Sequence, residues 1–355
     1  MLPDALRTEL AAVSDLRLLT QPDDLERFSR DAYDYSPVLR ERLAQCRAEL
    51  VVRPETVDAV VRVAAACRRH GVPLTLRGSG TGNYGQSVPL ESGVVMLMTQ
   101  LRAVRSIDRA SGVAVVECGC LMKDLNRELA GAGRQLRLMP STWRSATIGG
   151  FIAGGSGGIG SVRWGFLRDP GHLLGLEVVT MEQTPRVLQL EAGDAEALNH
   201  AYGTNGIITA LRLATATSVD WQEVVVDCPD WPAAVDLARR CTSAAIDLHL
   251  CTVLEAAVVD LLPSWDLPQR RSDRLLLLVA PDAVSTVQRL ASAVGAEMTH
   301  LGAEADRHGS GLRELSWNHT TLHLRQRDPD WTYLQMLLPQ PEINCLETLK
   351  QTWGD

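Results

Sequence analysis

The chain has 355 residues, of which 45% are hydrophobic and 22% are charged, and these values are ordinary for a globular protein of two domains. Its formal net charge of −8 gives no support for binding to nucleic acid or to an anionic membrane surface. The N-terminus lacks a basic region followed by an apolar core, and no apolar run approaches transmembrane length. We therefore expect a cytoplasmic protein with no nucleic-acid partner and no transmembrane segment.

The eight cysteines are scattered along the chain and do not have the spacing of metal ligands. Cys118-Gly119-Cys120 is not a C-x-x-C motif, and no histidine follows at a distance typical of zinc sites. Buried free thiols in a reducing compartment are the favoured interpretation. The cysteines therefore predict no metal site.

The first clearly patterned unit runs from residue 49 to residue 76. A strand at residues 49–52 is followed by a helix that Glu55-Thr56 opens and that carries apolar residues at helical spacing. Gly71 closes this helix as a C-cap, and a second strand-like run follows at residues 72–76. The pattern predicts a β-α-β unit that leads into a loop.

That loop, residues 77–89, is called the first glycine loop below. Its glycines alternate with Ser and Thr, so successive backbone N–H groups can face a phosphate, and Arg77 adds a positive charge. Residues 80–85 formally satisfy G-x-G-x-x-G, but no helix follows, as a Rossmann loop would require. A Walker loop is excluded because no Lys-Ser/Thr pair follows the glycines. The loop therefore predicts dinucleotide binding in another manner.

Short strands predicted at residues 94–98, 104–107 and 113–117 and a helix at 121–129 lead to residues 140–160, called the glycine stretch below. Glycine is too dense there for the interior of a helix or strand, because each glycine costs backbone entropy. The stretch is also too apolar for a flexible linker. Close approach of the backbone to a large flat ligand explains it better than packed turns that hold nothing, because the first glycine loop has the same character.

The remaining chain changes character near residue 219. Before it, the pattern predicts a hairpin at residues 173–181 and 186–190, a short helix at 195–201 and a strand at 206–213. After it, the predicted strands are 223–226, 247–253 and 274–280, and the predicted helices are 231–240, 254–262 and 283–294. Two strand-helix-strand passages in a row indicate a small α+β sandwich. We predict an α+β protein with domains at residues 1–218 and 219–355.

Several motifs, taken in order, resemble those of a known flavoprotein family. They are Arg53-Pro54, residues 77–82, Pro140-Ser141, residues 146–150, Trp164-Gly165, Arg168-Asp169, residues 176–179 and residues 203–209. Their order and spacing resemble the FAD-linked oxidases of the vanillyl-alcohol-oxidase and p-cresol-methylhydroxylase (PCMH) superfamily. The resemblance is greatest to the branch that contains D-lactate dehydrogenase and one of the polypeptides of glycolate oxidase. It covers residues 49–213 strongly and 224–338 loosely.

The resemblance implies a two-subdomain PCMH-type FAD-binding domain, followed by a cap domain over the isoalloxazine. The first glycine loop would hold the pyrophosphate, the glycine stretch would run along the ribityl chain and flavin ring, and the backbone near Ile207 and Ile208 would contact adenine. Strand core is an alternative for both isoleucines. The implied FAD-binding residues are Arg77, Gly78, Ser79, Gly80, Thr81, Gly82, Asn83, Gln86, Pro140, Ser141, Thr142, Thr147, Gly149, Gly150, Gly154, Ser156, Gly157, Gly158, Ile207 and Ile208.

The activity implied is that of an FAD-dependent oxidoreductase acting on CH–OH donors, a dehydrogenase or oxidase. It would take a hydride from a small-molecule substrate, a hydroxy acid or alcohol, onto flavin N5. The polar stretch at residues 314–327 supplies the candidate catalytic residues Asn318, His319 and Arg325. Arg325 or Arg327 could bind a carboxylate with two hydrogen bonds. The alternative is a solvated helix face, or histidines whose hydrogen bonds are satisfied where the two domains meet. No metal is predicted, because His319 and His323 have no evident third ligand.

Members of this family usually continue for about a further domain segment, whereas this sequence ends in a helix-like pattern at residues 342–352. We therefore expect an incomplete cap domain, which favours a homo-oligomer or a partner subunit because an open sheet edge exposes unpaired backbone groups. The alternative function is a catalytically incomplete FAD-binding protein that needs a partner chain.

The first prediction concerns how FAD is held. Some members of the superfamily attach FAD covalently through a histidine in the first loop, and Thr81 stands near that place here. We expect noncovalent FAD, so denaturation should release all of the flavin absorbance into the supernatant. Yellow colour retained on the precipitated chain would contradict this, and no flavin uptake from excess FAD would contradict the resemblance itself.

Overall fold

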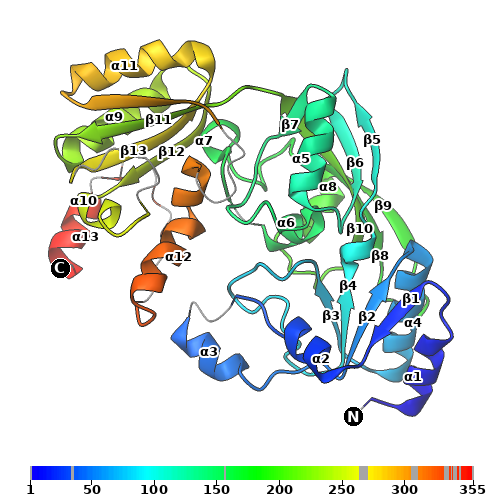
Figure 1. The fold of residues 1–355 in the computed structure, drawn as a ribbon. Coiled ribbons are helices and arrows are strands. Elements are labelled where there is room, and N and C mark those ends of the chain that lie inside the picture. The colour runs from blue at the N-terminus through cyan, green and yellow to red at the C-terminus, as the bar shows by residue number, and fades with distance from the viewer. Residues whose placement is uncertain are drawn as a thin grey trace.

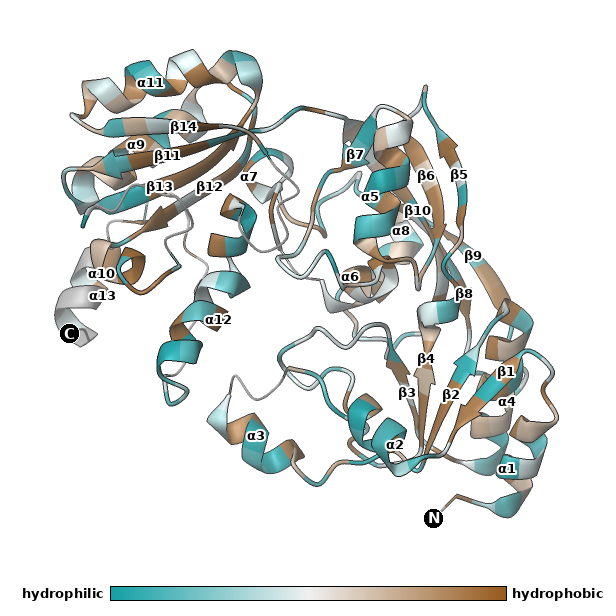
Figure 2. Cartoon of the chain, viewed as in Figure 1, coloured by the Kyte–Doolittle hydropathy of each residue, from teal (hydrophilic) through white to brown (hydrophobic). Residues whose placement is uncertain are grey.

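The computed structural model describes residues 2–32, 36–155, 157–263, 271–304 and 311–331, and also residues 336, 338, 342, 343 and 345–353. Within these residues the chain forms three sheets with helices packed on them, and the predicted α+β class is confirmed. Figure 1 shows the three sheets following one another through the molecule, from the N-terminal part to the part that carries α11. The strands are mostly apolar, while the outer helices alternate apolar and polar residues (Figure 2).

The first sheet has the strand order β1-β2-β4-β3 among the described residues. Its elements are α1 (Asp4–Ala11), β1 (Leu16–Leu19), α2 (Pro22–Phe28), α3 (Pro37–Leu43), β2 (Leu50–Pro54), α4 (Val57–His70), β3 (Leu74–Arg77), β4 (Val94–Leu97) and the 3₁₀ turn η2 (Met98–Gln100). The predicted β-α-β unit is present as β2-α4-β3. Strand β4 lies between β2 and β3 and is parallel to both, with Val95 opposite Val51 and Thr75.

Helix α4 has the ends that its sequence predicted. The Oγ1 atom of Thr56 accepts a hydrogen bond from the backbone N–H of Ala59, and Gly71 ends the helix with a left-handed φ of 63°. Val60, Val63 and Cys67 lie on its buried face. This packing fixes β3, and therefore the start of the first glycine loop at Arg77.

The second sheet has the order β5-β6-β10-β8-β9, and β7 also pairs with β10. Its elements are β5 (Val104–Asp108), β6 (Val113–Glu117), α5 (Met122–Gly131), β7 (Arg134–Leu136), α6 (Ile148–Gly154), α7 (Ser161–Trp164), β8 (Leu173–Val179), β9 (Val187–Glu191), α8 (Ala192–Ala195), η3 (Glu196–Leu198) and β10 (Ile207–Thr217). The predicted hairpin is confirmed as β8 and β9, with Val178 opposite Leu188.

Helix α6 corrects one expectation, because the glycine stretch was predicted to contain no helix. Ile148, Phe151 and Ile152 are buried at helical spacing, so packing offsets the entropy that the glycines cost. A side chain at Gly149 could not fit, since its Cβ would lie 2.5 Å from the Cβ of Cys118. The glycines in this helix therefore permit close packing.

The third sheet has the order β12-β13-β11-β14, and the described residues from β11 onward are called the cap region below. Its elements are β11 (Gln222–Cys228), α9 (Trp231–Ser243), β12 (Leu248–Leu254), α10 (Ala256–Val259), β13 (Asp273–Val279), η4 (Pro281–Ala283), α11 (Val284–Ala293), β14 (Glu297–Ala303), η5 (Leu312–Leu315), α12 (Asn318–Arg327) and α13 (Cys345–Trp353). Strand β10 belongs to the second sheet and ends at Thr217, just before the predicted domain boundary at residue 218. The division into two folding units at that residue stays a prediction.

Both faces of the third sheet are covered. Val224 and Val226 point to the core beneath α9 and α11, while Val225 points to a second core that contains Leu312 and Leu315 of η5. The alternation follows from the two-residue period of a strand. Helices on one side and η5 on the other therefore hold this sheet in place.

Several short elements were not predicted, namely β1, α2, α3 and β14, and the helix predicted at residues 254–262 is reduced to Ala256–Val259. Strands β1 and β14 lie at sheet edges with one partner each. Their pairing is decided by the neighbouring strand more than by local sequence.

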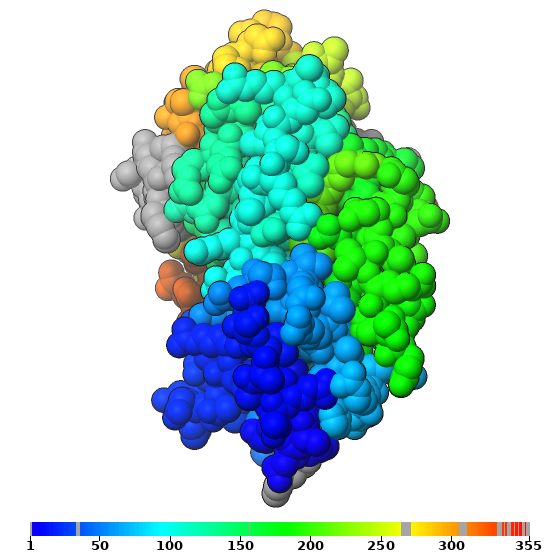
Figure 3. All heavy atoms as spheres, turned by 90° about the vertical axis from the view of Figure 1, so that its right-hand side faces the viewer, coloured from blue at the N-terminus to red at the C-terminus, as the bar shows by residue number. Residues whose placement is uncertain are grey.

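The cap region sits directly on the glycine stretch. Ile159 is fully buried in the core beside η5, and the backbone N–H of Gly160 donates to the carbonyl of His249 at 2.8 Å. The indole Nε1 of Trp221 donates to Oε1 of Gln135 at 3.1 Å. Figure 3 shows the same succession on one face of the molecule, from the N-terminal residues at one end to the cap region at the other.

The second prediction concerns an ion pair buried in the third sheet. Asp227 and Arg274 are both 5% exposed, 2.8 Å apart, and the Ser272 hydroxyl donates to the same carboxylate. Asp227→Ala should lower the free energy of unfolding by about 3–5 kcal/mol, because the buried guanidinium of Arg274 loses the carboxylate of Asp227. Denaturant unfolding measures this. Asp236→Ala is the control, because its pair with Arg240 is half-exposed and should cost about 0.5 kcal/mol; equal losses would contradict the prediction.

Candidate functional site

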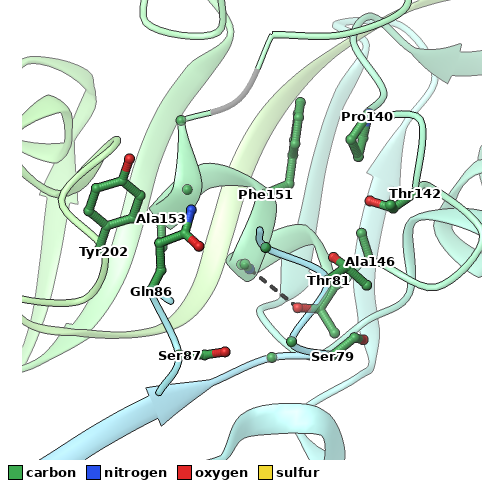
Figure 4. Close-up of a pocket in the computed structure, with 18 of the residues that line it drawn as sticks. Ser79, Thr81, Gln86, Ser87, Pro140, Thr142, Ala146, Phe151, Ala153 and Tyr202 are labelled. Atoms are coloured by element: carbon green, nitrogen blue, oxygen red, sulfur yellow. Dashed lines mark hydrogen bonds between the residues drawn. The ribbon is translucent and has the colours of Figure 1, made fainter. Parts of the chain in front are cut away.

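A cavity of about 390 Å³ lies between the first glycine loop, the glycine stretch and the start of α12. Figure 4 shows Ser79 and Thr81 of the first loop together with Thr142 and Ala146 of the glycine stretch, and Tyr202 on another part of the wall. Two segments about 60 residues apart in sequence thus face one space, and the cap region adds Trp317 and Asn318.

Most of the residues expected to bind FAD line this one cavity. They are Arg77, Gly78, Ser79, Gly80, Thr81, Gly82, Asn83, Gln86, Pro140, Ser141, Thr142, Thr147, Gly149, Gly150, Gly154, Gly157 and Ile208. Gly158 and Ile207 do not line it, and Ile207 is core, 1% exposed. Ser156 lies outside the described residues. Of the three catalytic candidates, Asn318 lines the cavity, whereas His319 and Arg325 do not.

Among the described residues that line the cavity, Arg77 is the only arginine or lysine. It is 6% exposed, its Nη1 donates to Oγ of Ser87 at 3.1 Å, and its Nε has no described hydrogen-bond partner. Burial lowers the pKa of Arg77, although a guanidinium stays protonated. A buried cation with an unused donor is a suitable partner for an anionic group such as a phosphate.

The glycines of the site divide into two kinds. A Cβ on Gly80 would lie 2.0 Å from Nη2 of Arg77, and one on Gly78 would lie 2.2 Å from Oγ1 of Thr147, so these glycines allow the walls to close. A Cβ on Gly157 would meet nothing nearer than the indole of Trp317 at 3.7 Å. Gly157 therefore leaves space that a side chain could fill, as a cradle for a large ligand requires. These residues fit FAD.

The cap region enters the site through a strained residue. Trp317 has φ 54° and ψ −136°, a conformation that costs a non-glycine residue on the order of 1–3 kcal/mol. Its side chain is 40% exposed and its indole tip faces Gly157. Trp317 and the following Asn318 thus form the cap-side wall of the cavity among the described residues.

His319 does not line the cavity, and its ring contacts Glu314. The distance from Nδ1 of His319 to Oε2 of Glu314 is 3.0 Å, and Nε of Arg144 donates to Oε1 of Glu314 at 3.0 Å. Burial acts to raise the pKa of Glu314, but the hydrogen bonds and charges of His319 and Arg144 outweigh it, so the pKa lies below its usual value. Arg325 donates to the carbonyl of Pro329.

Further lining residues were not among the candidates named above, although several of them lie in the first glycine loop, the glycine stretch or the polar stretch at residues 314–327. They are Leu76, Tyr84, Ser87, Met98, Cys118, Ala146, Phe151, Ala153, Gly155, His200, Tyr202, Gly203, Gly206 and Trp317. His200 and Tyr202 both have left-handed backbones, and Nε2 of His200 lies 2.9 Å from the Tyr202 hydroxyl. The close glycines Gly203 and Gly206 were the available signal. Burial raises the pKa of the Cys118 thiol, which disfavours the thiolate form that a nucleophile needs.

Comparison with known proteins places an FAD binding domain at residues 48–187. The chain is similar to glycolate oxidase subunit GlcD of Bacillus subtilis, with 33% identity over 148 residues, or 42% of this chain and 30% of that protein. It is also similar to the mitochondrial D-2-hydroxyglutarate dehydrogenase of Rattus norvegicus, with 27% identity over 62% of this chain and 38% of that protein. The resemblance to FAD-linked oxidases is confirmed, and FAD is the cofactor.

A solved structure of alkyldihydroxyacetonephosphate synthase has the same fold. Its TM-score is 0.81 at 20% identity, and the match covers 99% of this chain and 75% of that one. The chain spans less than half the length of the two curated relatives named above. None of the helices in the described part of the chain combines the length and apolar character needed to cross a membrane.

The third prediction uses the two kinds of glycine. Gly157→Leu should abolish FAD retention with little loss of apoprotein stability, because its Cβ would make only ordinary van der Waals contact with the Trp317 indole, at 3.7 Å, while the rest of the side chain would occupy part of the cavity that Gly157 lines. Gly149→Ala is the matched control, since its methyl group meets Cys118 and should lower apoprotein stability by about 1–3 kcal/mol. Flavin content after gel filtration and thermal unfolding of apoprotein measure both. Full FAD occupancy in Gly157→Leu would show that this loop does not face the cofactor.

Proposed function

We propose that the chain acts in an FAD-dependent dehydrogenase or oxidase that oxidises the CH–OH group of a small hydroxy acid or alcohol. The observation that carries the proposal is the single cavity shared by the two glycine segments and the cap region. The similarity to a glycolate oxidase subunit and to a D-2-hydroxyglutarate dehydrogenase supports a hydroxy acid as substrate.

The cap-side wall is suited to hold such a substrate. Asn318 offers an amide donor and an amide acceptor, which can orient a hydroxyl or a carboxyl oxygen. Trp317 offers an apolar plane that excludes water from the same space. FAD, when bound, supplies the acceptor for the hydride. The contribution of the protein is therefore to orient the substrate and to keep the site dry.

The surroundings of the site support two further proposals. Free, mostly buried cysteines favour a reducing compartment, and we assign the protein to the cytoplasm on that basis. Trp317 and Asn318 are the cap contribution to the cavity wall within the described residues. The alternative to a self-sufficient enzyme is that a second copy or a partner subunit completes this wall. This chain would then hold FAD, and substrate would be oxidised only in the complex.

The fourth prediction tests the proposed reaction. Anaerobic mixing of the FAD-loaded chain with a panel of 2-hydroxy acids and primary alcohols should bleach the visible flavin absorbance with one class of substrate. Asn318→Ala should slow that reduction about 10- to 100-fold, the effect of one lost hydrogen bond to a polar substrate group, without loss of FAD. Gln326→Ala is the control, because Gln326 is an exposed residue of the same helix. If no substrate reduces the flavin, the proposed reaction is contradicted, and the alternative of a catalytically incomplete FAD-binding protein remains.

A further inference from the structure

The strain at Trp317 is maintained by fixed structure on both sides. Before it, η5 is joined to the third sheet, where the backbone N–H of Leu312 donates to Oε1 of Glu223 at 2.8 Å. Ser316 is fully buried and its hydroxyl donates to the carbonyl of Arg313 at 3.0 Å. After it, the hydroxyl of Thr320 donates to the carbonyl of Leu315 at 2.7 Å. An unfavourable backbone conformation persists only where its surroundings determine it in this way.

Glu314 is the point at which this segment is joined to the cofactor side of the cavity. One carboxylate oxygen accepts from Arg144 and the other lies 3.0 Å from Nδ1 of His319, while the carbonyl of Glu314 lies 3.0 Å from Nε2 of His323. The side chains of Arg144 and Glu314 are 19% and 13% exposed. A charge-assisted pair so little exposed is screened much less than a surface pair.

Arg144 belongs to the segment of the glycine stretch that lines the cavity. Pro140, Ser141, Thr142 and Ala146 around it are wall residues, and its guanidinium lies 4.7 Å from the ring centroid of Trp143. The contact between Arg144 and Glu314 therefore joins two walls of one site, three residues from Trp317 along the chain.

We propose that Glu314 is a positioning residue for the proposed reaction, and that it holds Trp317 over the cavity by joining Arg144 to the start of α12. The proposal rests on the function proposed above. Glu314 does not line the cavity, so it acts through Trp317 and Asn318 and does not touch substrate or cofactor itself.

A second ion pair between the same parts of the molecule provides a matched control. Arg163 of α7 pairs with Asp247 at 2.8 Å, with side chains 29% and 50% exposed, and neither residue lines the cavity. Loss of this pair weakens the contact between α7 and the cap region, but it leaves the segment that carries Trp317 unchanged.

The test compares FAD release from the full-length, FAD-loaded variants, followed by the recovery of free-flavin fluorescence after dilution. Glu314→Gln should release FAD about tenfold faster than the wild type, since it removes one charge-assisted contact that keeps the wall closed. Trp317→Ala should do the same. The double variant should be no faster than either single variant, because both act through one wall. Asp247→Asn should release FAD at the wild-type rate.

Three results would overturn the proposal: an unchanged release rate in Glu314→Gln, an equal acceleration in Asp247→Asn, or full additivity with Trp317→Ala. If Glu314→Gln fails to fold, Arg144→Gln decides by the same measurement. FAD release does not require turnover, so a protein that reduces no substrate but shows these rates would contradict the proposed function and leave the positioning role intact. With an active substrate, Glu314→Gln should raise KM more than it lowers kcat.

Discussion

The structure depends on how closely the backbone of the glycine stretch approaches its neighbours. A Cβ on Gly149 would lie 2.8 Å from the carbonyl oxygen of Cys118, and one on Gly158 would lie 2.1 Å from that of Met139. A Cβ on Gly160 would lie 2.0 Å from the carbonyl oxygen of Arg137. Any other residue at these positions would force the packed segments apart. Because Ile159 between the last two is buried in the cap region, this packing also sets where the third sheet sits.

Other glycines of the first glycine loop and of the glycine stretch give the cofactor site its character. They make walls that consist largely of backbone and present few charged side chains, so the net charge of −8 is no obstacle to a phosphate-bearing ligand. Arg77 supplies local positive charge from a buried position beside the first glycine loop. The cavity therefore offers a phosphate-bearing ligand backbone N–H groups and the Arg77 guanidinium, whereas the net charge of the protein does not favour an anion.

The cap region is attached to this site by apolar packing and by a few polar contacts. The exposed pairs on helix surfaces, such as Arg62 with Asp58, contribute little to stability. The contacts of Arg144 with Glu314 and of Trp221 with Gln135 cross between the two parts where water is largely excluded. They fix how the two parts sit together, and so they also place Trp317 and Asn318 at the cavity wall.

The sequence by itself determined the features whose signals are local. Helix α4 was predicted with its Thr56 and Gly71 caps, the hairpin β8–β9 by apolar runs and turn residues, and dinucleotide binding by the first glycine loop. FAD itself was implied by the resemblance of the ordered motifs to a known family. These signals depend on residues close together along the chain, where capping, periodicity and backbone freedom act directly.

Only the tertiary structure decided the rest. The entropy that glycine costs in α6 can be judged from the local sequence. The close packing of Gly149 on Cys118 that offsets it cannot, because Cys118 follows β6, which is distant in sequence. His319 was a catalytic candidate because it lies in the polar stretch at residues 314–327 and a histidine can act as a base, whereas only the fold shows that its Nδ1 lies 3.0 Å from Glu314. Trp317 carries no unusual sequence signal, because its left-handed backbone is imposed by η5 and α12 on either side of it. Strain and wall position arise from contacts that the chain makes only once it has folded, so no reading of neighbouring residues could supply them.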